Sequence, residues 1–181
     1  MFVIGSFLCY KFIKYTKDKE KDKVNTLQCL INLLKEKGLK IAVAESCTGG
    51  LLGGALTSMP GSSEFFEMGI IAYSNKSKIK LLGIRDATIH EYGAVSENTA
   101  KEMAINIKNT AGTHIGVSIT GIAGPGGGSR DKPVGLVYIG ISMEDNTYIY
   151  KHCFGGDRAS IRKQSVLSAL EHILSLLVEE R

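Results

Sequence analysis

Apolar and polar residues follow one another along most of this chain in the two periods typical of helices and strands. Apolar residues three or four apart predict helices over 25–37, 49–58, 76–82 and 97–110, and a long last helix from 157 onward. Short apolar or alternating runs predict strands over 40–44, 68–73, 114–120, 134–142 and 147–154. The last two strands are expected to form a hairpin. This order predicts an α/β fold, a single three-layer-like domain with a mixed β-sheet flanked by helices.

The first 24 residues differ from the rest and are expected to form an N-terminal extension, with the domain covering 25–181. The uninterrupted apolar part of Met1–Tyr15 is about ten residues, about half of what a membrane-spanning helix needs. A positive segment before it and a clean cleavage site, both typical of a signal peptide, are missing. Three interpretations stay open: a weak signal or anchor, an amphipathic membrane-surface segment, and a flexible extension. The last is favoured.

Composition narrows the function classes. The 181 residues, 44% of them apolar, are enough for one core without disulfides or metal. The first 23 residues supply +3 of the formal net charge of +4, so the rest has no concentrated basic face. A nucleic-acid partner is therefore not expected, and a membrane partner is not favoured. The four cysteines form no C-x-x-C pair and the four histidines are scattered, which predicts reduced thiols, a cytoplasmic protein and no metal.

The most informative segment is Glu45–Gly50, between an apolar strand and an apolar helix start. It places two nucleophile candidates, Ser46 and Cys47, where a helix N-terminus offers unpaired N–H groups and partial positive charge. Taken alone, Ser46 is more often a helix cap than a nucleophile. Cys47 taken alone is more often a small buried hydrophobic residue.

Three other loops also follow predicted strands, at 73–78, 120–129 and 155–158, and the carboxyl ends of strands are where α/β sheets bind ligands. The segment 121–129 holds five glycines, which indicates a close approach of backbone to something. It is not a Walker A loop, because no Gly-Lys-Ser/Thr follows. Lys78 and Tyr73 taken singly are an ordinary helix lysine and a strand-end tyrosine, and Arg158 is the better anion contact beside a capping Asp157.

Taken together, these segments resemble a known family. Its motifs occur here in order as Glu45-Ser46-Cys47-Thr48-Gly49-Gly50, Pro60-Gly61-Ser62-Ser63, Tyr73-Ser74-Asn75-x-x-Lys78, Gly93-Ala94-Val95-Ser96, Thr120-Gly121-Ile122-Ala123-Gly124-Pro125, Lys132-Pro133-Val134-Gly135 and Gly156-Asp157-Arg158. The chain resembles the CinA C-terminal domain family, the nicotinamide-nucleotide amidases, over about residues 25–178. The resemblance does not extend to the nucleotide-processing domain that longer family members carry.

The resemblance implies hydrolysis of the carboxamide of nicotinamide mononucleotide (NMN) to nicotinic acid mononucleotide and ammonia, in pyridine nucleotide recycling and without a cofactor. By position, Ser46 matches the nucleophile, Lys78 the general base and Tyr73 a supporting site residue. The expected substrate-binding residues are Thr48, Gly49, Gly50, Thr120, Gly121, Gly124 and Arg158. Family members are commonly oligomers, so a second copy of the chain, as a homodimer, is an expected partner.

The chemistry of amide hydrolysis fits these roles. A serine needs a base that takes its proton and donors that hold the oxyanion. A lysine can be that base only if it is neutral near pH 7, through burial or a nearby cation such as Lys76 or Arg158. The N–H groups of Thr48–Gly50 are the expected oxyanion hole. Two alternatives stay open: a pyridine-nucleotide-binding module without turnover, and a hydrolase that uses Cys47.

Overall fold

The computed structural model describes residues 19–179, and the expected N-terminal extension lies largely outside them. Its strands are β1 (Ile41–Glu45), β2 (Phe66–Ile71), β3 (Ile115–Gly121), β4 (Leu136–Met143) and β5 (Asn146–Cys153). Its helices are α2 (Lys19–Glu36), α3 (Leu51–Leu56), α4 (Asn75–Leu82), α5 (Asp86–Tyr92), α6 (Glu97–Ala111) and α7 (Arg158–Glu179), with a 3-10 turn, η1, at Ser62–Glu64. None of these helices combines the length and apolar character needed to span a bilayer.

The five strands form one mixed sheet in the order β2-β1-β3-β4-β5. β1 pairs in parallel with β2 and β3, and every residue of β1 is buried. β4 and β5 are antiparallel, as the expected hairpin requires. The parallel strands β1, β2 and β3 therefore end at the same edge of the sheet, which brings three of the predicted loops together.

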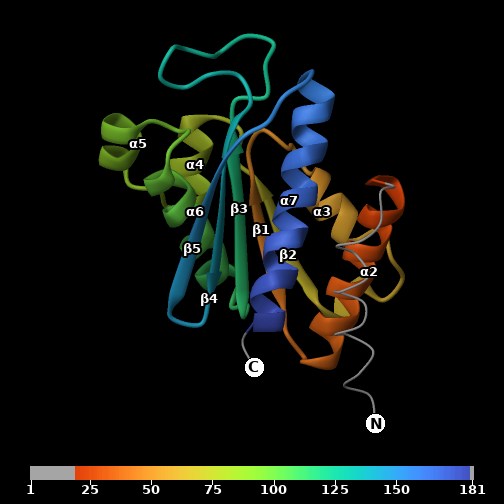
Figure 1. The fold of residues 1–181 in the computed structure, drawn as a ribbon. Helices are drawn as coiled ribbons and strands as arrows, with labels where there is room; N and C mark the ends of the chain where they lie inside the picture. The colour runs from red at the N-terminus through yellow and green to blue at the C-terminus, as the bar shows by residue number, and fades with distance from the viewer. Residues whose placement is uncertain (1–18, 180–181) are drawn as a thin grey trace.

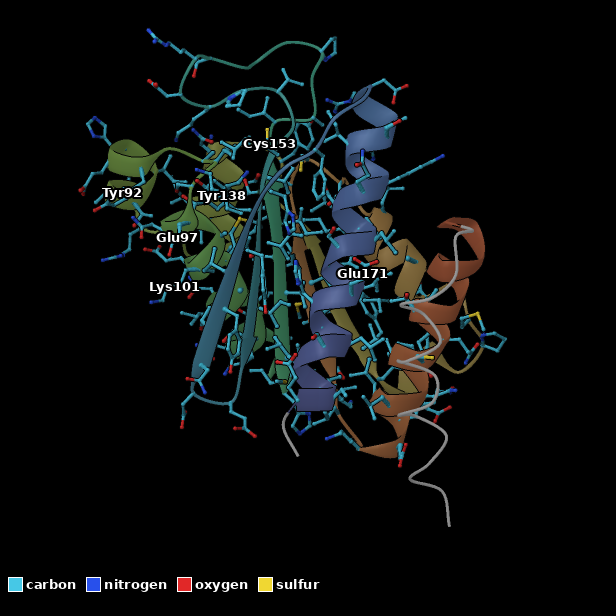
Figure 2. All side chains as sticks on the ribbon, viewed as in Figure 1. Tyr92, Glu97, Lys101, Tyr138, Cys153 and Glu171 are labelled. Atoms are coloured by element: carbon cyan, nitrogen blue, oxygen red, sulfur yellow. The ribbon has the colours of Figure 1, made fainter. Side chains whose placement is uncertain are left out.

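Helices cover both faces of the sheet and give the expected three layers (Figure 1). α2, α3 and α7 pack together on one face, and α4, α5 and α6 pack on the other. Figure 2 shows this division in the side chains, with Tyr92 and Lys101 on the α5–α6 side and Glu171 on α7 across the sheet. The larger apolar core lies between the sheet and α2 and α7, and a smaller one lies under α4 and α6. The expected fold class is confirmed.

Two details depart from expectation. Helix α5, Asp86–Tyr92, was not expected, because Thr88 is its only buried residue and an apolar repeat is missing from its sequence. Cys29 is disulfide-bonded, whereas Cys47 and Cys153 are free thiols. The expectation of four reduced thiols is therefore wrong for Cys29.

A pair of histidines joins the edge strand β5 to helix α7. His152 Nε2 lies 3.0 Å from His172 Nε2, and the His172 ring stacks on Tyr150 with centroids 3.6 Å apart. Burial, together with repulsion from a protonated His152, lowers the pKa of His172 to about 4. Burial also lowers the pKa of His152. The folded chain therefore favours the neutral pair, in which one imidazole donates to the other.

This pair predicts that the protein loses stability in mild acid. Unfolded histidine has a pKa near 6.5, so the unfolded chain binds protons first as the pH falls from about 7 toward 4. We expect wild type to lose about 1–2 kcal/mol of unfolding free energy between pH 7 and 5 through this pair. The variant His172→Phe keeps a ring against Tyr150 and should lose much less. Urea midpoints at both pH values measure this, and equal losses in the two proteins would contradict it.

Candidate active site

The turn between β1 and α3 holds Ser46 at the carboxyl edge of the sheet. The Ser46 N–H donates to Ile119 O at 2.9 Å, so pairing of β1 with β3 continues one residue beyond the strand. The chain then reverses through Gly49 and Gly50, whose φ angles of 58° and 95° favour glycine. The Ser46 side chain is almost fully buried and lines a pocket. Its position is thus fixed by the sheet and by the turn.

Lys78 lies on helix α4, which follows β2, the strand beside β1. Its side chain extends to Ser46. Ser74 and Ser77 form a capping box that starts this helix, with each hydroxyl accepting from the other residue's N–H at 3.0 Å. Lys78 is 1% exposed, and its Nζ lies 2.9 Å from Ser46 Oγ. Nζ also donates to Ala72 O at 2.9 Å and to Tyr73 O at 3.3 Å. The structure therefore brings together the predicted nucleophile and the predicted base, 32 residues apart in the chain.

The electrostatics of Lys78 suit a base. Burial lowers its pKa to about 8. Lys78 forms no ion pair within residues 19–179, so no carboxylate holds it in the charged form. Of the two causes expected from the sequence, burial accounts for the shift, and the neighbouring cations Lys76 and Arg158 do not contribute to it. A neutral amine has two N–H donors for the two backbone carbonyls, which leaves its lone pair for the Ser46 hydroxyl proton.

Cys47 lies beside Ser46 and lines the same pocket, but its thiol is poorly suited to attack. Burial raises the pKa of Cys47 to about 11, despite a smaller opposing effect from the charge of Lys78. Because the thiolate is the reactive form of cysteine, a raised pKa leaves Cys47 protonated and inert near neutral pH. These properties favour Ser46 of the two neighbouring candidates.

Glu45 occupies the N-terminus of helix α3. Its buried carboxylate accepts from Gly50 N–H at 3.0 Å, Leu52 N–H at 3.1 Å and Gly53 N–H at 2.7 Å. The expected oxyanion hole is therefore corrected, because Gly50 N–H is bound to Glu45 and Gly49 N–H donates to Ser46 O. Neither Gly49 nor Gly50 lines the pocket.

Two N–H groups of this turn remain available, those of Cys47 and Thr48. Neither donates a hydrogen bond to another residue within the described chain. The Thr48 side chain is fully buried away from the pocket, and its Oγ1 has no partner among residues 19–179. Thr48 does not line the pocket, so its backbone N–H, adjacent to the lining residue Cys47, is the one group it offers near Ser46. The available oxyanion donors, the N–H groups of Cys47 and Thr48, therefore begin one residue earlier than the expected set, Thr48–Gly50.

The pocket beside Ser46 has a volume of about 260 Å³ and combines the predicted loops. Its lining residues are Ser46, Cys47, Tyr73, Lys78, Ala94, Val95, Thr120, Gly121, Ile122, Ala123, Gly124, Gly126, Gly127 and Arg158. The sequence had pointed to Thr120, and its hydroxyl donates to Ala94 O at 2.7 Å. That bond holds the loop before α6 against the pocket. Ala94 and Val95 had no signal of their own in the sequence beyond the motif that contains them.

The glycine-rich loop supplies free backbone donors on one side of this pocket. The N–H groups of Gly124, Gly126 and Gly127 donate to no other residue in the described part of the chain. Arg158 Nη1 donates to Gly124 O at 2.8 Å, and Arg158 Nη2 donates to the Tyr73 hydroxyl at 2.8 Å. Successive free N–H groups beside a guanidinium form a concave site suited to an anion.

A larger hollow, of about 710 Å³, lies at the opposite edge of the sheet and contains none of the predicted site residues. Two of its polar side chains already have backbone partners: Lys108 Nζ donates to Glu144 O, and His114 Nδ1 accepts from Lys40 N–H. Residues 19–179 also hold no group of three or more His, Cys, Asp and Glu side chains placed to bind a metal. The pocket beside Ser46 is therefore the better candidate for chemistry.

Sequence reasoning missed one basic residue at this site. Arg162, on α7, donates from Nε to Cys47 O at 3.1 Å and from Nη2 to Thr48 O at 2.6 Å. It follows Arg158 by four residues, which places both on neighbouring turns of one helix face. That spacing was the available signal.

Known proteins match the chain over most of its length. The CinA C-terminal domain family matches residues 24–177. A CinA-like protein from Kosmotoga olearia is 49% identical over 151 residues, which cover 83% of this chain and 37% of that protein. A CinA-like protein from Fusobacterium nucleatum is 48% identical over 153 residues, covering 84% of this chain and 37% of its own length. The chain spans about 40% or less of the length of the curated relatives it matches first.

Solved structures agree with these sequence matches. The competence/damage inducible protein CihA from Agrobacterium tumefaciens has a TM-score of 0.81 and 39% identity, covering 83% of this chain and 93% of its own. The competence damage-inducible protein A (ComA) from Klebsiella pneumoniae has a TM-score of 0.85 and 30% identity, covering 88% of this chain and 99% of its own. The chain therefore belongs to the CinA C-terminal domain family.

Proposed function

We propose that this chain is a nicotinamide-nucleotide amidase, which hydrolyses the carboxamide of NMN to nicotinic acid mononucleotide and ammonia. The observation that carries the proposal is the buried contact of Lys78 Nζ with Ser46 Oγ at 2.9 Å, at the edge of a pocket. The lowered pKa of Lys78, about 8, allows the amine to take a proton near neutral pH. The choice of NMN as the substrate rests on the family resemblance.

In the first half of the reaction, neutral Lys78 takes the Ser46 hydroxyl proton while Ser46 Oγ forms a bond to the carboxamide carbon. The carbonyl oxygen becomes an oxyanion, for which the N–H groups of Cys47 and Thr48 are the available donors. Protonated Lys78 then gives its proton to the amide nitrogen. The carbon–nitrogen bond breaks, ammonia leaves, and an ester remains on Ser46.

In the second half, Lys78 is again neutral and takes a proton from water. The hydroxide oxygen bonds to the ester carbon, and the bond to Ser46 Oγ breaks as that oxygen takes the proton back from Lys78. The products are a free carboxylic acid and the original enzyme. One lysine thus serves both halves in turn.

For the phosphate of NMN, the glycine loop is the better-supported contact. The N–H groups of Gly124, Gly126 and Gly127 are free within residues 19–179, and Arg158 is bound to the same loop. The N-terminus of α3 is already neutralised by the Glu45 carboxylate, which would repel a phosphate. We assign the anion to the loop and not to the helix.

Ammonia release from NMN tests the proposal. Wild type should release ammonia from NMN, and Ser46→Ala should lower the rate by about 10³-fold or more, because the covalent route is lost. Ser58→Ala is the matched control, since Ser58 is exposed at the end of α3 and outside the pocket. Nicotinamide, NAD and glutamine serve as comparison substrates.

Each alternative has its own result in this assay. Calorimetric NMN binding by wild type with no ammonia over hours would favour the pyridine-nucleotide-binding module. An active Ser46→Ala together with an inactive Cys47→Ala would favour the cysteine mechanism. The raised pKa of Cys47, about 11, is the observation against the second of these.

A further inference from the structure

Arg162, on α7, binds the backbone of the turn that carries Ser46. Its guanidinium donates to two successive backbone carbonyls, Cys47 O at 3.1 Å and Thr48 O at 2.6 Å. Gly49 makes room for it, because a Cβ at that position would lie 3.3 Å from Arg162 Nη2. The planar guanidinium group of Arg162 thus binds two acceptors in a fixed geometry. The ammonium group of a lysine cannot reproduce that geometry.

No other role accounts for this arginine. It forms no ion pair within residues 19–179, and it does not line the pocket. Contact with substrate is thus left to Arg158, four residues earlier, which does line it. The half-buried charge of Arg162 is directed only at the backbone of this turn.

Peptide geometry links these carbonyls to the oxyanion donors. The C=O and N–H groups of a trans peptide unit point in opposite directions, and Cys47 O shares its unit with Thr48 N–H. When Arg162 holds Cys47 O toward α7, Thr48 N–H points away from α7, toward the face of the sheet where Lys78 approaches Ser46. On the other side of the turn, Gly49 N–H holds Ser46 O, which fixes the unit that carries Cys47 N–H.

We propose that Arg162 is a positioning residue for the oxyanion hole. Its bond to Cys47 O orients Thr48 N–H toward the oxyanion formed at Ser46, and its bond to Thr48 O holds the unit whose Gly49 N–H fixes Ser46 O and with it Cys47 N–H. This inference rests on the proposed amidase activity. Arg162 also adds positive potential at the turn, as its lowering effect on the pKa of Cys47 indicates. Both effects act on the charge that develops in the transition state and not on substrate binding.

Steady-state kinetics on NMN test this with Arg162→Met and Arg162→Lys. We expect kcat to fall about 10- to 100-fold in Arg162→Met while KM stays within about threefold, because ground-state binding is untouched. Arg162→Lys should recover little, since one ammonium cannot hold both carbonyls in the same geometry. Added guanidinium at millimolar concentration should restore part of the kcat of Arg162→Ala and should not raise that of wild type.

Two controls separate this role from a merely structural one. Lys163→Met removes the exposed charge of the next residue on α7 and should leave kcat and KM unchanged. Arg158→Met should raise KM, the opposite pattern from Arg162. If wild type releases no ammonia from NMN, the proposed function itself is wrong. If wild type is active and Arg162→Met has the same kcat, the inference about Arg162 is wrong and the proposed function stands. The same holds if kcat falls only in proportion to the loss of folded protein.

Discussion

Replacing Lys78 by methionine is expected to lower kcat for NMN by about 10³-fold or more, with the fold retained. Methionine matches the buried aliphatic stem of Lys78, which is 1% exposed, so the packing between α4 and β1 survives. The variant lacks any group that could take the Ser46 proton across the 2.9 Å contact. Ammonia release measures the loss, and Lys80→Met, an exposed neighbour on α4, is the matched control.

The pH dependence of wild-type activity tests whether Lys78 is the base. Only the neutral amine takes the Ser46 proton, so kcat should rise with pH and level off above the Lys78 pKa of about 8. A group with that pKa is neutral in about a tenth of molecules at pH 7 and about nine-tenths at pH 9. Lys78→Arg keeps the positive charge but cannot lose it in this range, so it should be inactive at both pH values. A flat profile between pH 6 and 9 would contradict the assignment.

A stability measurement tests whether the group with this pKa is Lys78. The folded pKa of Lys78, about 8, lies below its ordinary value of 10.5, so the unfolded chain binds the proton more tightly. Between these two values stability therefore rises with pH. Lys78→Met should lack this increase. Unfolding midpoints in urea at pH 8 and pH 10 compare the two proteins, and an equal rise in both would contradict the burial of a charged amine.

The order of the strands and of every helix except α5 could be read from the sequence, because each of these elements carries its own apolar period. The start of α2 could not. That helix begins at Lys19, whereas the apolar spacing starts only near Leu27 and predicted a start at 25. Residues 19–24 are mostly Lys, Glu and Asp, which form helix without any apolar face to signal it.

The pairing of Ser46 with Lys78 could not be derived from spacing. Thirty-two residues separate them, and they meet only because β1 and β2 are parallel neighbours whose carboxyl ends coincide. The family resemblance supplied this pair. Glu45 and Arg162 act through backbone atoms, and a pattern of side chains does not identify which backbone atoms they contact.

The same limit explains why the sequence did not show that two of the expected oxyanion donors, Gly49 and Gly50 N–H, are already bonded. A glycine-rich turn before a helix is typical of an anion site, so the N–H groups of Gly49 and Gly50 were expected to be free. Instead, the Glu45 carboxylate at the end of β1 accepts from Gly50 N–H, and Gly49 N–H donates to Ser46 O. A charged residue in the last position of a buried strand is costly unless it is satisfied, and that was the available signal.

Glu45→Ala is expected to destabilise the protein more than any other single change considered. The carboxylate of Glu45 is 1% exposed and accepts three backbone N–H groups at distances from 2.7 to 3.1 Å. Its removal leaves those donors buried and unpaired, at a cost of about 1–3 kcal/mol each before relaxation and on the order of 3–5 kcal/mol in total.

Glu45→Gln should fall between wild type and Glu45→Ala. The amide oxygen can still accept, but its NH₂ group faces N–H donors where the second carboxylate oxygen stood. Glu67→Gln is the control, because Glu67 is an exposed carboxylate on β2 whose pair with Lys40 is a surface ion pair. Urea midpoints for the three variants measure the order. Equal midpoints for Glu45→Ala and Glu67→Gln would show that Glu45 does not hold the start of α3, and Ser46 would then need another anchor.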